Sequence, residues 1–163
     1  MNLSPHFTRK EFESRCAIPD DAIPAFIALC QSILEPIRER FQQPITITSG
    51  YRTPKYNAKI GGAENSQHVA TVFNCAADFT MVNDLCFVFD WIRLHSGLMF
   101  DQVILEREEE ASPPACIHVS WRHKDPRRDA LIGLTRNRSK YIRVPVNPPF
   151  PTHDLTSEIW GES

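Results

Sequence analysis

The sequence of 163 residues predicts an α+β fold, a small antiparallel sheet with helices packed on one face. Residues 23–41 and 84–95 carry apolar side chains at steps of three and four, the spacing of helices with one buried face. Short runs rich in β-branched residues, among them "ITIT", "QVIL" and "CIHVSW", indicate strands. A chain of this length with 42% hydrophobic residues can bury one core, so we expect one domain.

The first elements are helices. Thr8 and Glu11 have the spacing of a capping box, which predicts a short helix after Thr8. A longer helix is expected over residues 23–41, and Pro36 should kink it because proline has no backbone N–H to donate. The buried stripe of this helix is formed by Phe26, Leu29, Cys30, Ile33, Ile37 and Phe41.

A strand and a compact helix follow. The strand is expected at Ile45–Thr48 and is ended by Gly50. In "TPKYNAKIGG", Thr53 suits the N-cap of a helix, Pro54 its first position and Gly61 its end. The three residues stand where helix punctuation requires them, so we predict a helix between them.

The second half contains a helix and two strands. The helix over residues 84–95 is closed by Gly97. The runs "DQVILE", at 101–106, and "CIHVSW", at 116–121, are separated by the polar stretch "REEEASPP". We therefore predict that they are neighbouring antiparallel strands.

The end of the chain differs in composition. The stretch "PVNPPFPTHD" has too many prolines for the interior of a sheet, so we predict a domain over residues 1–143 and an extended tail over residues 144–163. Basic residues gather between 122 and 143, where they either face a polyanion or form a solvated loop. Since no motif that reads a nucleic-acid groove accompanies them, we expect no nucleic-acid partner.

Some classes of protein are disfavoured. No stretch approaches the roughly 20 apolar residues of a membrane span, and the start lacks the blocks of a secretory signal. We expect a soluble protein made in the cytoplasm without a signal peptide. The five cysteines are widely spaced, which argues against a disulfide framework and against a cysteine-rich zinc site.

Two of the predicted strands each carry a potential metal ligand. Alternation places His118 on one face of its strand and Asp78 on one face of the strand in "CAADFT". The bulky apolar neighbours point to the opposite faces: Ile117, Val119 and Trp121 in the first strand, Ala77 and Phe79 in the second. With His68, at the end of the Gly-rich stretch "GGAENSQH", these residues make a His-Asp-His set that would suit zinc.

The order and separation of four segments carry a family resemblance. "SGYRTPKYNAKIGGAENSQH", "AADF", "FDQVILE" and "IHVSW" resemble the zinc-dependent M15 peptidases of the D-alanyl-D-alanine carboxypeptidase type, above all the small, phage-encoded, endolysin-like members. The likeness spans about residues 3–122 and implies the hedgehog/DD-peptidase-like fold, with a zinc cleft on the sheet face opposite the helices.

The resemblance also implies roles for single residues. His68, Asp78 and His118 would bind one zinc ion. Arg52 would contact a substrate oxygen, for which its planar guanidinium is suited. Ser66 and Gln67 would make substrate contacts or, alternatively, serve only to shape the loop.

The sequence departs from the family pattern twice. Nine residues, "VATVFNCAA", separate His68 from Asp78, where family members usually have six including a glycine; the extra side chains either leave the metal set intact or line the substrate cleft. Many members carry an acidic residue three positions before the last zinc histidine, and here that position is Ala115. Glu106 is our candidate for the missing general base, because antiparallel pairing would bring it beside His118.

Other acidic residues and histidines are assigned no role. We expect Glu108, Glu109 and Glu110 to be solvated loop charges, and His6, His95, His123 and His153 not to bind metal.

The function we expect is zinc-dependent hydrolysis of a peptide bond in bacterial peptidoglycan stem peptides, as a carboxypeptidase or an endopeptidase. The enzyme would act at the cell wall, after release or as part of a virion. The alternative is a weak or inactive binding or structural module of the same fold, such as a phage tail component, which Ala115 and the long His68–Asp78 connection favour.

Overall fold

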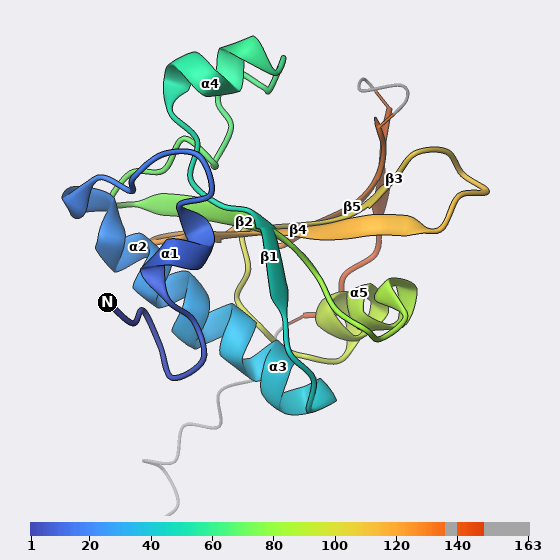
Figure 1. Ribbon diagram of the computed structural model, residues 1–163. Coiled ribbons are helices and arrows are strands. Elements are labelled where there is room, and N and C mark those ends of the chain that lie inside the picture. Colours follow the sequence, from blue (N-terminus) through green and yellow to red (C-terminus); the bar gives the residue numbers. More distant parts are fainter. Residues whose placement is uncertain (136–139, 149–163) are drawn as a thin grey trace, which may run out of the picture.

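The computed structural model describes residues 1–135 and 140–148 and contains one open sheet (Figure 1). The strand order in this sheet is β1-β2-β4-β3-β5-β6. The strands are β1 (Thr46–Ser49), β2 (Asn74–Thr80), β3 (Gln102–Arg107), β4 (Pro114–Arg122), β5 (Asp129–Leu134) and β6 (Tyr141–Val144). All neighbours pair antiparallel except β3 and β5, which are parallel.

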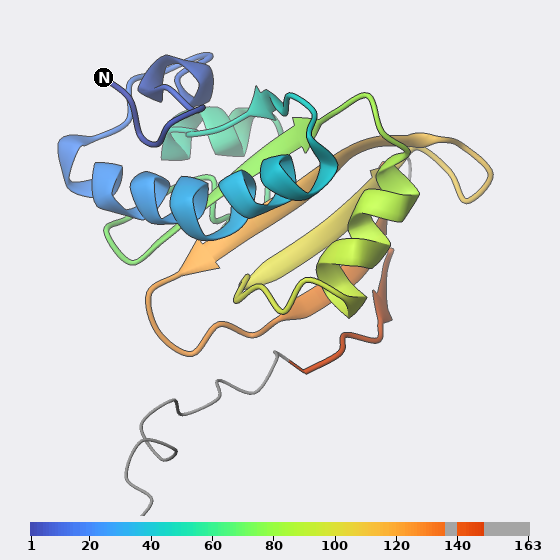
Figure 2. The same ribbon diagram turned by 90° about the horizontal axis from the view of Figure 1, so that it is seen from below.

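The helices divide between the two faces of the sheet. They are α1 (Arg9–Phe12), α2 (Ile23–Leu29), α3 (Glu35–Phe41), α4 (Pro54–Lys59) and α5 (Leu85–Leu94), with a 3₁₀ turn, η1 (Asp20–Ala22), and a π turn, η2 (Cys30–Leu34). Figure 2, a view from below, shows α2, α3 and α5 against one face. Figure 1 shows α4 and the loop that follows it above the opposite face, which these three helices leave free and which we call the open face. The predicted α+β class, with the main helices on one face, is confirmed.

The predicted long helix is present as α2, η2 and α3 in succession. Pro36 lies just after the π turn η2. Because proline lacks an N–H and its ring crowds the carbonyl one turn earlier, the regular hydrogen-bond ladder cannot pass through it. The predicted interruption takes the form of a wider π turn, and the apolar stripe remains buried on both sides of it.

The helix boundaries follow the predicted punctuation. Thr53 Oγ1 accepts a hydrogen bond from the backbone N–H of Tyr56 at 3.1 Å, at the start of α4. Gly61 and Gly97, which follow α4 and α5, have φ of 67° and 66°. This left-handed region favours glycine, since it has no Cβ.

The sheet holds more strands than the sequence indicated. The pairing of β3 with β4 confirms the predicted antiparallel neighbours. β5 was not predicted: "DALIGL" is short and follows a strongly charged stretch, so it carries little local strand signal. It lies parallel to β3, with Gln102 opposite Asp129 and Arg107 opposite Leu134.

Alternation along the strands separates the core from the open face. The side chains that point to the helices are fully or almost fully buried and include Cys75, Ala77, Phe79, Val103, Leu105, Ile117 and Val119. The alternate positions face the other way. The register places Asp78 directly opposite His118 across β2 and β4. Both side chains therefore lie on the open face.

The chain after β6 runs along α5. Arg93 Nη1 donates to the Pro145 carbonyl at 2.8 Å, and the backbone N–H of Asn147 donates to the Arg93 carbonyl at 3.0 Å. Most of the predicted extended tail, from residue 149 onward, lies outside the described residues. Among the helices of the described ranges, none has the length and apolarity to cross a membrane.

A close backbone approach joins the first helix to the turn after β1. A Cβ on Gly50 would lie 2.5 Å from the Phe12 carbonyl oxygen and 2.6 Å from its Cα. The backbone N–H of Tyr51 donates to the same carbonyl at 2.9 Å. Only glycine fits here without moving the backbone.

We predict that Gly50→Ala lowers the free energy of unfolding by about 1–3 kcal/mol, because the added methyl meets rigid backbone atoms. Urea denaturation would measure the change. Gly61→Asn is the control, because asparagine tolerates the left-handed region, and its effect should be small. An unchanged midpoint for Gly50→Ala would show that α1 can move away from this turn.

Candidate metal centre

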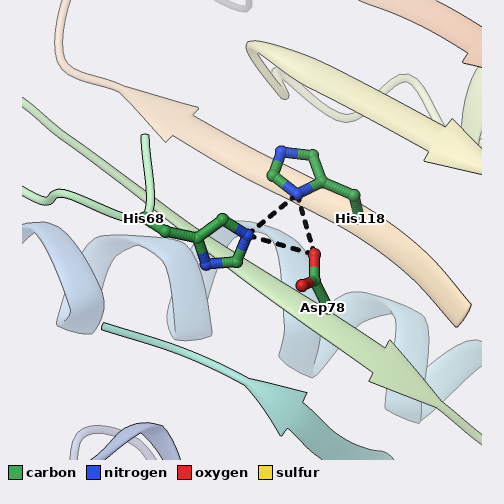
Figure 3. A group of neighbouring side chains, drawn as sticks. All are labelled: His68, Asp78 and His118. Atoms are coloured by element: carbon green, nitrogen blue, oxygen red, sulfur yellow. Dashed lines mark hydrogen bonds and ion pairs between the residues drawn. The ribbon is translucent and has the colours of Figure 1, made fainter. Parts of the chain in front are cut away.

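Three potential ligands meet on the open face of the sheet (Figure 3). His68 comes from the loop before β2, Asp78 from β2 and His118 from β4. His68 Nε2 lies 3.1 Å from Asp78 Oδ1 and 3.2 Å from His118 Nδ1, and His118 Nδ1 lies 2.8 Å from Asp78 Oδ1. The structure thus brings together the three predicted ligands from positions up to 50 residues apart in the sequence.

The ring of His68 is oriented by the backbone. Its Nδ1–H donates to the Gly50 carbonyl at 2.7 Å. The other nitrogen, Nε2, therefore presents a lone pair to the cluster, the arrangement in which a histidine binds a metal. The close approach of Gly50 to α1 fixes the carbonyl that sets this orientation.

The cluster fits a metal ion. With Nε2 of His68, Nδ1 of His118 and a carboxylate oxygen of Asp78, acceptor atoms converge and repel one another unless a cation or proton lies between them. Two nitrogens bound tetrahedrally at 2.0–2.1 Å to one zinc ion would be about 3.3 Å apart. The observed 3.2 Å between His68 and His118 matches this spacing. A set of two histidines and one carboxylate is also typical of catalytic zinc sites.

Asp78 is held as a carboxylate. Burial would raise its pKa, but the interactions with His68 and His118 outweigh burial and hold the pKa well below its usual range. Only 15% of its side-chain surface is exposed, against 4% for His68 and 11% for His118. An ionised, nearly enclosed carboxylate between two imidazoles is a strong ligand for a divalent cation.

Arg52 supports the carboxylate from the β1 side. Its Nη2 donates to Asp78 Oδ2 at 2.9 Å and to Ser49 Oγ at 2.9 Å, and its backbone N–H donates to the His68 carbonyl at 2.9 Å. Within the described ranges, Nη1 of Arg52 has no hydrogen-bond partner and can donate to a bound molecule. The predicted guanidinium therefore lies at the cluster.

Glu106 lies on the other side of the cluster, on β3. Glu106 lies opposite Cys116 of β4, which is two residues before His118 and on the same face of that strand. Burial raises the pKa of its carboxyl; the charge of Asp78 acts in the same direction, while His118 and Arg52 oppose it. In the part of the chain that the structure describes, no hydrogen bond restrains this carboxylate. Such a group takes up a proton at a higher pH than an exposed glutamate does.

Gly133 makes room for the Glu106 carboxylate. A Cβ on Gly133 would lie 2.8 Å from Glu106 Oε2 and 2.8 Å from Cε1 of Tyr141. The absence of a side chain on β5 thus allows Glu106 to occupy its position between β4 and β6.

Two neighbours of His118 on β4 have no catalytic group to offer. Ala115 is exposed and lies where the register of β3 and β4 shifts, and its methyl group cannot exchange a proton. Burial raises the pKa of the Cys116 thiol to about 12, with the charges of Asp78 and Glu106 acting in the same direction. Cys116 therefore remains a neutral thiol at pH 7 and is neither a thiolate ligand nor a nucleophile.

The two further predicted contact residues lie before His68. Ser66 belongs to a turn in which its N–H donates to the Ala63 carbonyl and its carbonyl accepts from Val69. Gln67 Oε1 accepts a hydrogen bond from Arg127 Nη2 at 3.2 Å. Its Nε2 is buried and has no partner among the described residues.

The long connection between His68 and Asp78 still returns Asp78 to the cluster. It closes in a tight turn, in which the Thr71 N–H donates to the Asn74 carbonyl at 2.9 Å. Phe73 is 61% exposed, and its ring centroid lies 6.2 Å from that of His123. The extra residues lie next to the segment that follows β4, and they do not displace any of the three potential metal ligands.

A buried carboxylate next to the site was not anticipated from the sequence. Asp101, directly before β3, is fully buried and accepts hydrogen bonds from the backbone and side chain of Arg127, the shortest at 2.6 Å. Since Arg127 also donates to Gln67, Asp101 positions the segment that precedes His68. Part of the basic stretch at 122–143 is thus paired within the fold. A buried aspartate and an arginine 26 residues away leave no local pattern.

We predict that Asp101→Asn lowers the free energy of unfolding by about 2 kcal/mol at pH 7, because hydrogen bonds to the charged Arg127 are lost. Although burial acts in the opposite direction, these hydrogen bonds hold the pKa of Asp101 below its usual value. Its contribution is therefore present above the unfolded pKa, about 3.9, and is lost as the pH falls through the folded pKa.

Urea denaturation of both proteins at pH 7 and pH 3 tests this expectation, since the difference between them should shrink at pH 3. Asp90→Asn serves as the control, because its pair with Arg93 leaves Asp90 51% exposed and should matter little. A constant difference at both values of pH would mean that packing, not charge, explains the effect.

The chain is similar to a known protein family over more than half of its length. A family model described as Peptidase M15 matches residues 5–107. This range contains Arg52, His68, Asp78 and Glu106, whereas His118 lies beyond it and joins the group through the pairing of β2 with β4. The chain has no significant match among curated proteins.

Proposed function

The chain belongs to the peptidase M15 family, and from this premise we propose that it is a zinc-dependent peptidase that hydrolyses a peptide bond in peptidoglycan stem peptides. The observation that carries the proposal is the convergence of His68, Asp78 and His118 between a guanidinium and an acidic residue of raised pKa. The cluster supplies the ligands, and its two sides supply the groups that peptide hydrolysis needs.

The three side chains would hold the ion. The chemistry that zinc supplies in such a site is polarisation of a carbonyl and a lowered pKa, about 7, for water. The Gly50 carbonyl and Arg52 would keep the ligands oriented, through the Nδ1–H of His68 and through Asp78 Oδ2.

Glu106 would act as general base and then as general acid. It would accept a proton from the attacking water on Oε1 or Oε2 and return it to the amine of the leaving group. Burial, which raises its pKa, favours the first transfer, because a carboxylate of higher pKa is a stronger base than an exposed one. This role replaces the acidic residue that is missing at position 115.

Arg52 would stabilise the negative charge that develops on the carbonyl oxygen during attack. Its Nε and Nη2 are held by Ser49 and Asp78, so the guanidinium is fixed before a substrate binds. A pre-oriented donor is effective because little reorganisation is needed during the reaction.

A peptidase of stem peptides has to reach the cell wall. Stem peptides lie outside the cytoplasm, so a protein made inside the cell would reach the wall after release or as part of a virion. A module of the same fold that only binds the wall is the competing function, and the absence of an acidic residue at Ala115 favours it.

We predict that the purified protein binds about one zinc ion per chain and that His118→Ala loses most of it, because two remaining ligands hold zinc weakly. Metal content after dialysis measures this. Incubation with a stem pentapeptide, with and without chelator, should give cleavage products by mass spectrometry only without chelator. Retention of zinc by both His68→Ala and His118→Ala would exclude the cluster as the metal site.

We predict that Glu106→Gln keeps zinc and stability but loses about 10²–10⁴-fold in turnover, the usual contribution of a general base. Gly133→Ala should have a similar but smaller effect, because its methyl displaces the end of a flexible carboxylate and not the backbone. The matched control is the triple change of Glu108, Glu109 and Glu110 to Gln, which should leave turnover nearly unchanged. The opposite pattern would assign the base to that loop.

A further inference from the structure

A polar hollow of about 170 Å³ opens beside the candidate metal centre, on the β1 side. Its lining includes Ser14, Arg15, Ser49, Tyr51, Arg52 and Tyr56. Arg52 and Ser49 connect the hollow to the cluster, since Nη2 of Arg52 bonds both Ser49 Oγ and Asp78 Oδ2 at 2.9 Å. A group bound in the hollow would therefore lie next to the reacting bond.

The charge of the hollow is positive. Two guanidinium groups, those of Arg15 and Arg52, belong to its lining, and no acidic side chain of the described residues does. Arg52 already shares its charge with Asp78. Within the described ranges Arg15 pairs with no carboxylate, so its charge is not neutralised by the protein.

Arg15 is also held in place. Its guanidinium carbon lies 5.3 Å from the centre of the Tyr56 ring, close enough for a cation–π interaction. Tyr56 is fixed in turn by α4, whose first turn is capped by Thr53. A restrained guanidinium beside hydroxyl groups suits a carboxylate, because the planar fork can donate two parallel hydrogen bonds.

We propose that this hollow is the subsite for a carboxylate of the substrate and that Arg15 is the residue that recognises it. The proposal rests on the proposed peptidase function and extends it to the charge of the substrate. A stem peptide offers two such groups, the C-terminal carboxylate and the α-carboxylate of its D-glutamate residue. The first would make the enzyme a carboxypeptidase, and the second would place the cut within the stem.

The test compares three peptides with the zinc-loaded full-length protein: L-Ala-γ-D-Glu-L-Lys-D-Ala-D-Ala, its C-terminal amide, and the form in which the γ-linked D-glutamate is replaced by γ-linked D-isoglutamine. One of the two amidated peptides should show a KM at least about tenfold higher than the free acid, as expected when a charge-assisted hydrogen bond is lost. The amide that is affected identifies which carboxylate binds in the hollow.

Arg15→Gln should raise the KM for the free acid by a similar factor and abolish the preference over that amide, with kcat and zinc content nearly unchanged. Arg15→Lys should restore part of the preference. Arg40→Gln is the matched control, because Arg40 also lies over an aromatic ring, that of Phe41, but does not line the hollow. A preference that survives Arg15→Gln would overturn the proposal.

Failure of the hollow can be told from failure of the peptidase function. If the wild-type protein cleaves the free acid and both amides equally well, the hollow is not a carboxylate subsite and the peptidase function stands. If it cleaves none of them, the peptidase function fails, and isothermal titration calorimetry with the same peptides decides on the hollow. Tighter binding of the free acid than of one amidated peptide, with the difference lost in Arg15→Gln, would support the carboxylate subsite. Equal affinities for the three peptides, or no binding, would overturn it.

Discussion

The pairing of Asp78 with His118 across β2 and β4 is the constraint on which the rest of the structure depends. Because side chains alternate along a strand, a slip of one residue in either strand would turn its ligand toward the helices. The slip is prevented by the opposite face, where Phe79, Ile117 and Val119 are fully buried under the helices. The apolar core thus holds the polar cluster in register from the opposite face of the sheet.

The third ligand depends on a different kind of contact. His68 comes from a loop, and loops alone position a side chain poorly. Here its Nδ1–H is bound by the Gly50 carbonyl and its own carbonyl accepts from the Arg52 N–H. Both partners follow β1, and the first of them is pressed against Phe12 of α1. The N-terminal helix, far from the cluster in sequence, therefore takes part in the orientation of the ligand.

Much of this arrangement could be predicted from local pattern. The helix caps, the alternation in "CAADFT" and "CIHVSW", and the pairing of β3 with β4 all rest on residues close together in the sequence. The parts that escaped prediction join distant residues. β5 pairs parallel with β3, Asp101 binds Arg127, and Gly133 lies beneath Glu106. Each of these contacts depends on the order of the strands in the sheet, so no local spacing in the sequence predicts it.

The ends of the sheet bear on how the protein behaves in concentrated solution. An outer strand with free N–H and C=O groups can recruit a strand from another molecule and start aggregation. Here both outer strands, β1 and β6, have only four residues. The pairing of β1 shifts between Ile47 and Ser49, and β6 runs into Pro145, which cannot donate a hydrogen bond. Neither border offers a long, regular template, so an incoming strand would find few partners, and the open face can stay polar and accessible without the sheet growing sideways into fibres.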